Sequence, residues 1–446
     1  MIGFATLLLG LVLGPRTVEL DIAPGVESVV LELDGQVVAS LSGPPWSATC
    51  DFGERLQPHR LVATAFGPDG EPLESAETWI NLPRGAARLS ASLRPGETPG
   101  VGDRLLLHWQ NVYGDPPTEI HVTFDGVELA VDDPSELVLP EYDPETLHVL
   151  DVEVVFPNNL TAVEQLTIGG GRMDRSAREL TGVPVLVGRA RADVAPASLA
   201  GALKSAGKPV QVNAVEEGPA QLVVVIEPDA RDDLERLLER GTRRLRERRI
   251  RLGHRDPTGR GGAFLSLLGQ GDWMRFVWPF ARPSDDSTTG FDIFEFSREF
   301  TRDEASFVGL LRYLEPPHRE AVAPERLADA VAVAGLLAST RSRRRAVIVV
   351  LGDVDGDAST LPASTVRDYL ASLGVPLFVW TTTLEATRAA EARWGDARRV
   401  ASIYGLEDAI EQVGDHLARQ RIVWLEGALL PQSVEAVPGS GLTVVR

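Results

Sequence analysis

The sequence predicts a multidomain protein, with two all-β sandwich domains followed by an α/β domain built on a doubly wound sheet. Three observations lead to this prediction. A segment near the N-terminus is repeated once, at an offset of about 90 residues. No helical periodicity appears before Ser198. From Leu222 onward, strand-like and helix-like segments alternate, which is typical of α/β folds.

The chain begins with an apolar run, Met1–Gly14. It is too short to span a bilayer, which takes about 20 residues. Its length suits the hydrophobic part of a signal peptide, so residues 1–15 are predicted to direct export to the periplasm or the outside of the cell. The alternative is that the run is a buried first strand, or that the start codon is misassigned. No membrane association is expected beyond this segment.

The internal repeat predicts the first two domains. Leu31–Ala39 matches Val122–Ala130, and His59–Gly67 matches His148–Phe156. Both members of the first pair carry Asp-Gly between apolar stretches, which is a strong signal for a β-hairpin. His59 and His148 stand at equivalent positions, which favours a structural role for both. Two β-sandwiches of immunoglobulin-like (Ig-like) size follow. They are expected at Arg16–Arg84 and Ala86–Ile168, with a Gly-rich linker at residues 169–177.

The remaining residues, 178–446, are predicted to form the α/β domain. A small β-rich entry segment comes first, with strands at Val183–Val187 and Pro209–Val215 and a short helix at Ala197–Ser205. The later strands are expected at Leu222–Glu227, Trp273–Phe280, Phe291–Phe300, Ala346–Leu351, Pro376–Thr381 and Val400–Tyr404. The helices are expected at Asp232–Ile250, Asp303–Tyr313, Pro324–Ser339, Ala363–Leu373, Glu385–Arg393 and Leu406–Gln420.

The composition and motifs of the chain argue against several classes of function. The formal net charge is −20, which argues against a nucleic-acid partner, because such proteins usually present a basic surface. The single cysteine, Cys50, cannot form an intramolecular disulfide. The chain has no HExxH, GxSxG or phosphate-binding Gly-rich motif, and its histidines are scattered. These features predict a protein that is not an enzyme and needs no cofactor.

Two segments begin with an apolar run typical of a buried strand and end in a group of carboxylates. They are Leu222–Asp233 and Arg345–Ser359. Carboxyl ends of strands are where open α/β sheets place their ligands. The arrangement resembles the von Willebrand factor type A (VWA) domain. Residues 178–446 are similar to the bacterial VWFA-related family first defined in Acidobacteria, in which a β-rich segment precedes the core. Arg421–Leu425 and Leu442–Arg446 are similar to the closing hairpin of that family.

The resemblance implies a metal-ion-dependent adhesion site, made from a DxSxS motif, a later Thr and a later Asp. Carried over by position, these ligands fall on Glu227, Asp229, Arg231, Glu325 and Asp353. Only Asp353 keeps its residue type, so the site is expected to be degenerate. Arg231 is expected to replace the cation with a salt bridge to the acids. The alternative is a carboxylate-rich site for Ca²⁺ or Mn²⁺.

A second acidic group follows in the same loop. Asp353, Asp355, Asp357 and Ser359 occupy positions 1, 3, 5 and 7 of a calcium-loop pattern. The loop lacks the glycine at position 6, and Ser364 stands in place of the final glutamate. A polar loop after a sheet strand is the simpler interpretation.

The function predicted from these observations is a non-enzymatic exported protein that mediates protein–protein interaction through a VWA-like domain with a degenerate metal site. One alternative is a Ca²⁺- or Mg²⁺-dependent adhesion or sensing module. Another is an accessory subunit of an ATPase or hydrolase acting in trans, which rests on analogy of fold. The sequence does not identify the protein partner.

Overall fold

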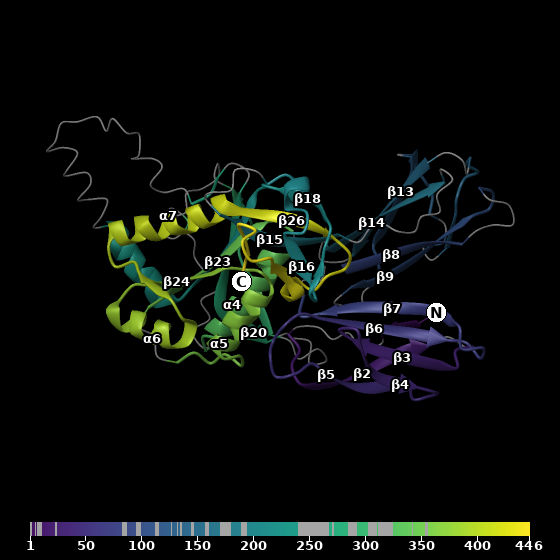
Figure 1. Ribbon diagram of the computed structural model, residues 1–446, viewed down its shortest axis with the longest axis horizontal. Coiled ribbons are helices and arrows are strands. Elements are labelled where there is room, and N and C mark those ends of the chain that lie inside the picture. The colour runs from purple at the N-terminus through teal and green to yellow at the C-terminus, as the bar shows by residue number, and fades with distance from the viewer. Residues whose placement is uncertain are drawn as a thin grey trace. The chain divides into compact units, whose positions relative to one another are not determined.

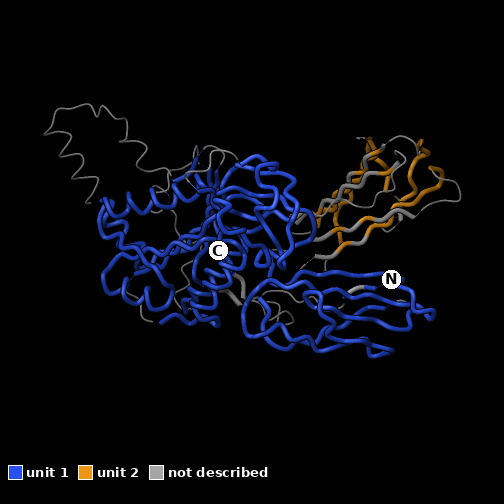
Figure 2. The backbone as a smooth tube through the Cα atoms, viewed as in Figure 1, with its two compact units in different colours: residues 1–83, 180–446 blue, residues 84–179 orange. Residues whose placement is uncertain are grey.

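A computed structural model describes much of the chain, and Figure 1 shows the arrangement of its elements. The described residues are 2–4, 6, 11–22, 25–82, 87–94, 100–111, 116–125, 127–131, 133, 136–143, 147–156, 160–169, 180–188, 194–239, 267–269, 272–283, 292–301, 310, 324–340, 342–352 and 356–446. They divide into two compact units, coloured in Figure 2. Unit 1 is Met1–Pro83 with Leu180–Arg446, and unit 2 is Arg84–Glu179.

The N-terminal part of unit 1 is a β-sandwich of two antiparallel sheets. One sheet has the order β1-β2-β5 and the other β4-β3-β6-β7. Strand β6 alternates strictly between buried and partly exposed positions, as expected for a strand with one face in a core. The inward side chains form one hydrophobic cluster that includes Leu31, Leu61 and Phe52. The strands are β1 (Ile2–Phe4), β2 (Pro15–Ile22), β3 (Ser28–Leu33), β4 (Gln36–Leu41), β5 (Ser47–Asp51), β6 (His59–Phe66) and β7 (Pro72–Ile80).

The apolar N-terminal run contributes to this sandwich. β1 pairs with β2, beginning with Ile2 opposite Ile22, and Ile2 and Val12 are buried in the core. The Asn81 side chain binds both main-chain groups of Val12, accepting from its N–H at 2.7 Å and donating to its carbonyl at 2.9 Å. Among the described residues of this run, Ile2–Phe4 therefore form a strand and Val12 lies in the core. Export itself stays a prediction.

Unit 2 repeats the same arrangement of a four-stranded and a three-stranded sheet. The orders are β11-β10-β13-β14 and β12-β9-β8. β10 and β13 pair antiparallel like β3 and β6, so the repeat seen in the sequence has a structural counterpart. The strands are β8 (Ala87–Arg94), β9 (Arg104–Asn111), β10 (Glu119–Phe124), β11 (Val127–Glu128), β12 (Glu136–Val138), β13 (Leu147–Phe156) and β14 (Leu160–Gly169).

The repeated Asp and His form the same contact in both sandwiches. Asp34 has a positive φ of 53°, and its carboxylate binds Nδ1 of His59 at 2.7 Å. Asp125 has a φ of 50°, and its carboxylate binds Nδ1 of His148 at 2.6 Å. Aspartate tolerates the left-handed conformation better than most residues. The pair thus ties each hairpin turn to the neighbouring strand, which is the structural role expected for both histidines.

The C-terminal part of unit 1 contains a seven-stranded mixed sheet. Its order is β21-β20-β19-β23-β24-β25, with β22 also paired to β20. β19 lies parallel to β20 and β23, and β24 lies parallel to β23 and β25. β21 and β22 run antiparallel to β20, so the sheet is mixed. The strands are β19 (Ala220–Ile226), β20 (Trp273–Pro283), β21 (Asp292–Phe296), β22 (Phe300–Thr301), β23 (Arg344–Leu351), β24 (Leu377–Thr381) and β25 (Ala397–Arg399).

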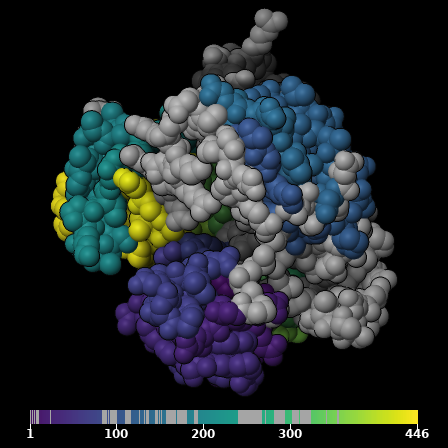
Figure 3. All heavy atoms as spheres, turned by 90° about the vertical axis from the view of Figure 1, so that its right-hand side faces the viewer, coloured from purple at the N-terminus to yellow at the C-terminus, as the bar shows by residue number. Residues whose placement is uncertain are grey.

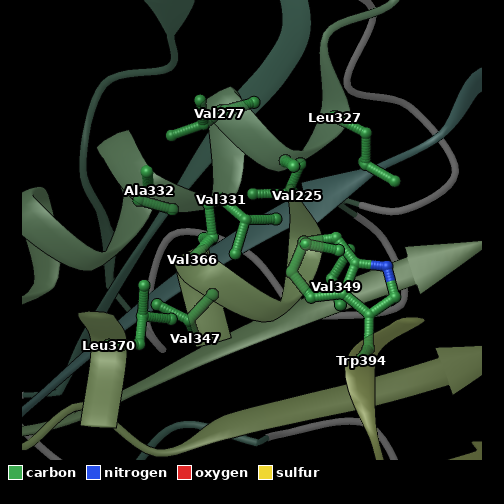
Figure 4. Close-up of a cluster of buried hydrophobic side chains, with 14 of the residues drawn as sticks. Val225, Val277, Leu327, Val331, Ala332, Val347, Val349, Val366, Leu370 and Trp394 are labelled. Carbon is green, nitrogen blue, oxygen red and sulfur yellow. The ribbon is translucent and has the colours of Figure 1, made fainter. Parts of the chain in front are cut away.

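Both faces of the two central strands are buried, and this explains their unbroken apolar sequences. One face packs on α4 (Leu327–Ser339) and α5 (Ala363–Ser372), and Figure 4 shows this cluster around Val225, Val347 and Val349. The other face packs on α7 (Ile403–Arg419) and on a helix over residues 228–239. α6 (Leu384–Trp394) lies against β24 and β25.

Two further antiparallel sheets complete unit 1. Their orders are β18-β26-β15-β28 and β17-β16-β27. The expected closing hairpin is wrong, because β15 lies between β26 and β28 and pairs with both. These strands are β15 (Leu180–Val187), β16 (Leu203–Ser205), β17 (Lys208–Pro209), β18 (Val212–Glu216), β26 (Gln420–Glu426), β27 (Val434–Ala436) and β28 (Leu442–Val444). Two short 3₁₀ helices are η2 (Pro196–Leu199) and η3 (Pro431–Ser433).

The predicted fold class is wrong. Strands predominate over helices in the described residues, and six of the seven sheets are antiparallel. Residues 178–446 do not form one doubly wound domain, because their strands are divided among three sheets. The error has a physical cause. A buried apolar run indicates a strand covered on both faces, but it does not indicate how many other strands join the same sheet.

Candidate functional site

The predicted site residues lie near the carboxyl ends of β19 and β23. Glu227 follows β19 directly and is only 7% exposed. Its Oε2 accepts a hydrogen bond from the Gly352 N–H at 2.6 Å, just after β23. A Cβ at position 352 would lie 2.8 Å from the backbone nitrogen of Ala230. Gly352 therefore lets the two strand ends approach closely enough for this contact.

The environment of Glu227 disfavours its charged form. Burial is the main cause and raises its pKa from 4.5 to about 7. The Gly352 N–H acts in the opposite direction, since it stabilises the carboxylate. The charges of Glu325 and Asp229 raise the pKa further, whereas Arg393 lowers it. The structure thus brings three of the predicted acids, Glu227, Asp229 and Glu325, within electrostatic range of one another.

Glu325 lies immediately before α4. Burial raises the pKa of its carboxyl group, and the charges of Asp229 and Asp357 add to that effect. Its main chain is held on two sides: residue 325 forms an isolated bridge with Phe280, and its carbonyl accepts from the Ala358 N–H at 2.8 Å. Glu325 therefore belongs to the same acidic region as Glu227.

Asp357 has a structural task. Its carboxylate accepts from the N–H groups of Leu327 at 2.9 Å and Ala328 at 3.3 Å, which satisfies donors in the first turn of α4. It also pairs with Arg393 at 2.9 Å. Ser359 contributes to the same end of the helix, where its hydroxyl accepts from the Asp329 N–H at 3.1 Å. Asp353 and Asp355 lie outside the described residues.

The sequence analysis missed a buried carboxylate, Asp329. It pairs with Arg326 at 2.6 Å and accepts from the backbone N–H groups of Thr360 and Leu361. A signal was available, because Arg326 and Asp329 stand at an i,i+3 spacing that places both on one helix face. Asp329 joins the segment after the acidic loop to α4.

Arg231 does not take the place expected of it. In the described part of the chain its guanidinium forms no ion pair, although its backbone N–H donates to the Glu227 carbonyl at 3.0 Å. Arg393, from α6, is the arginine that faces the acids. Arg393 belongs to an element more than a hundred residues after Arg231.

Several oxygens of this acidic region already have partners. Among the described residues, no group of three His, Cys, Asp or Glu side chains has metal-site geometry. The oxygens of Asp357 are already engaged by backbone N–H groups and by Arg393. Ca²⁺ and Mg²⁺ need several free oxygens around one point. What these residues do is hold the ends of β19, β23 and α4 together.

Comparisons with known proteins find no family and only solved structures of low similarity. No family model matches the chain, and no curated protein matches it. Fibronectin(III)-like modules of Clostridium thermocellum CbhA are 13% identical, with a TM-score of 0.16, and the match covers 38% of this chain and 93% of that chain. The central fibronectin-III array of RIM-binding protein is 11% identical, with a TM-score of 0.23, and the match covers 43% of this chain and 78% of that chain.

A third solved structure, the proximal thread matrix protein 1 from the mussel byssus, is 11% identical, with a TM-score of 0.28, and the match covers half of each chain. The predicted membership of the VWA and VWFA-related families is wrong: no family model matches the chain, and two of the similar solved structures are fibronectin-III modules.

Within the part of the chain that the structure describes, no helix has the length and apolar character needed to cross a membrane.

Proposed function

We propose that this chain is a non-enzymatic, exported protein that binds another protein through a free edge of its first β-sandwich. The observation that supports the proposal most strongly is strand β4. It is the outer strand of the order β4-β3-β6-β7, and its sequence, QVVASL, contains no charged residue. Val37 is 61% exposed and Val38 39% exposed.

An edge of this kind is suited to strand addition. Proteins usually protect edge strands with lysine, proline or a bulge, because an open edge pairs with other chains. β4 has no charged residue and no proline, and its register against β3 shifts at Val38, where it has a bulge. Val37 lies on the paired side of that bulge, opposite Glu32. An extended peptide paired there would gain main-chain hydrogen bonds and cover the exposed valines. The first sandwich is the purple part of the surface in Figure 3.

The second sandwich has a corresponding hairpin, which ends in the edge strand β11. Val127 of β11 is 67% exposed, but in the sequence repeat it aligns with Gln36, and Glu128 aligns with Val37. The second sandwich thus carries a charge where β4 carries its most exposed valine. The proposal is therefore confined to the first sandwich.

The remaining parts of the proposal are that the chain needs no cofactor and acts in the periplasm or outside the cell. Because Ile2 and Val12 are buried in the first sandwich, we expect the N-terminal segment to remain attached to the mature chain. Cell fractionation followed by mass spectrometry of the N-terminus tests both points. A cytoplasmic protein would remove export from the proposal.

The binding proposal is tested with two matched variants in the source organism. Val37→Lys adds a charge to β4, whereas Leu73→Lys adds one to β7, the opposite edge of the same sheet, where Leu73 is 57% exposed. Proteins that co-purify with tagged parent and variants are quantified by mass spectrometry. We expect Val37→Lys to reduce a specific partner by about tenfold or more, equivalent to 1.4 kcal/mol, and Leu73→Lys to retain it. Equal recovery with both variants would exclude β4 as the binding edge.

A further inference from the structure

Arg345 is a buried arginine without a counter-charge. It lies in β23 and is 4% exposed. In the described part of the chain its guanidinium has no ion pair, and its Nε has no hydrogen-bond acceptor. Burial alone lowers its pKa to about 10, and no acid acts in the opposite direction. Buried charges are normally paired, since an unpaired one is strongly unfavourable.

The polar groups nearest in the fold are already in use. Arg344, whose side chain belongs to the other face of the strand, pairs with Asp272 at 3.4 Å. Asp272 also accepts from the Ala220 N–H at 2.6 Å. The Gln420 side chain accepts from the Arg345 N–H at 2.5 Å and donates to its carbonyl at 3.2 Å, so it serves the main chain and not the guanidinium.

A second orphaned group lies beside Arg345. Gln221 of β19 is its partner in the parallel register, which places both side chains on the same face of the sheet. Gln221 is 1% exposed, and its Nε2 donates to the Leu337 carbonyl at 2.6 Å. This bond fixes the orientation of the amide. Its Oε1 is buried and finds no donor among the described residues.

We propose that Arg345 binds a small monovalent oxyanion of the carboxylate or bicarbonate class, beside Gln221 at the amino end of β23. A planar oxyanion matches the fork of a guanidinium and forms two charge-assisted hydrogen bonds. A single negative charge balances the single positive charge in this apolar surrounding. Bicarbonate also carries a hydroxyl, which donates to Gln221 Oε1. A water molecule would join the two orphaned groups but would leave the charge of Arg345 unbalanced.

The test measures thermal unfolding of the full chain at constant pH and ionic strength. Sodium bicarbonate, formate or chloride replaces the bulky sulfonate salt sodium MES in steps. A ligand that binds only the folded state raises Tm as its concentration increases. We expect a saturable rise of a few degrees with bicarbonate and formate, and a smaller rise with chloride.

Three variants identify the binding group. Arg345→Met should abolish the response. Gln221→Glu supplies a carboxylate beside Arg345, so it should abolish the response to added anion. It also loses the hydrogen bond to the Leu337 carbonyl, so the test uses its response to anion and not its own Tm. Arg367→Met removes an exposed arginine that pairs with Asp368, and it should respond like the parent.

Equal melting of the parent chain in all of the salts would overturn the proposal in favour of a bound water. A response that survives in Arg345→Met would overturn it as well. If Arg345→Met does not fold, Gln221→Glu decides, because a response retained in that variant contradicts a site next to Gln221.

Discussion

At the scale of single residues, the buried acids and bases of this protein differ in how many partners they have. Asp329 is held by Arg326 and by two backbone N–H groups. The carboxylate of Glu227 accepts from the Gly352 N–H, and other acids lie close by. A buried carboxylate with so little support takes up a proton more readily than one in water.

Glu227 should therefore make stability depend on pH. Its pKa of about 7 in the folded chain exceeds the ordinary value of 4.5. The folded state binds more protons between these two values, so stability falls as pH rises from about 4.5 to 7. The shift corresponds to about 3 kcal/mol. We expect Glu227→Gln to unfold at higher urea concentration than the parent at pH 8, and at a similar concentration near pH 4. Parallel pH profiles for the two proteins would contradict this assignment.

At the scale of elements, the starts of helices were set by capping groups, some of them distant in sequence. Ser402 caps α7, accepting from the Gly405 N–H at 3.0 Å, and the helix begins at Ile403 where a strand was expected. This serine could have been recognised as a cap from sequence. The cap of α4, Asp357, lies 30 residues beyond Leu327, so its role could not be derived from local spacing.

Replacing Asp357 should weaken α4. Asp357→Ala leaves the N–H groups of Leu327 and Ala328 without their acceptor and removes the pair with Arg393. We expect a loss of about 1–2 kcal/mol in the free energy of unfolding, measured by urea denaturation. Asp368→Ala is the control, since Asp368 pairs with Arg367 at the surface and should change stability by less than about 0.5 kcal/mol. Equal losses would show that capping contributes little.

At the scale of the molecule, the first sandwich and the mixed sheet are parts of one unit. Leu56 belongs to the same hydrophobic cluster as α4 and α5, and the Tyr369 hydroxyl donates to the Asn81 carbonyl at 2.8 Å. The Gln432 side chain donates to the Pro58 carbonyl at 2.7 Å. Unit 2 has a hydrophobic cluster of its own, which shares no residue with those of unit 1.

Excision of unit 2 should therefore leave unit 1 folded. We expect a variant in which a Gly/Ser linker joins Pro83 to Leu180 to unfold cooperatively and to keep its secondary structure by circular dichroism. Removal of Met1–Pro83 is the contrasting variant. It should lower the cooperativity of unfolding, because it removes Leu56 from the hydrophobic cluster of α4 and α5 and removes the Asn81 carbonyl that binds Tyr369. A cooperative 84–446 fragment would show that the first sandwich is independent.

The sequence by itself determined the local elements. The Asp-Gly hairpins, the repeated strands, the buried runs of β19 and β23 and helices α4 to α7 follow from periodicity and turn residues, with shifts of a few residues at their ends. The carboxyl ends of the buried strands also indicated the region of Glu227 and Asp229, whereas Glu325 was placed there only by the family resemblance.

Only the tertiary structure decided how the strands divide among sheets and which charges meet. β15 separates β26 from β28, Arg393 and not Arg231 faces the acids, and Arg345 is left beside Gln221 without a partner. Strand pairing and ion pairing join residues far apart in the chain, and hydrophobic patterns specify burial without specifying the neighbour. The fold class and the proposed binding edge therefore depended on contacts that no local pattern contains.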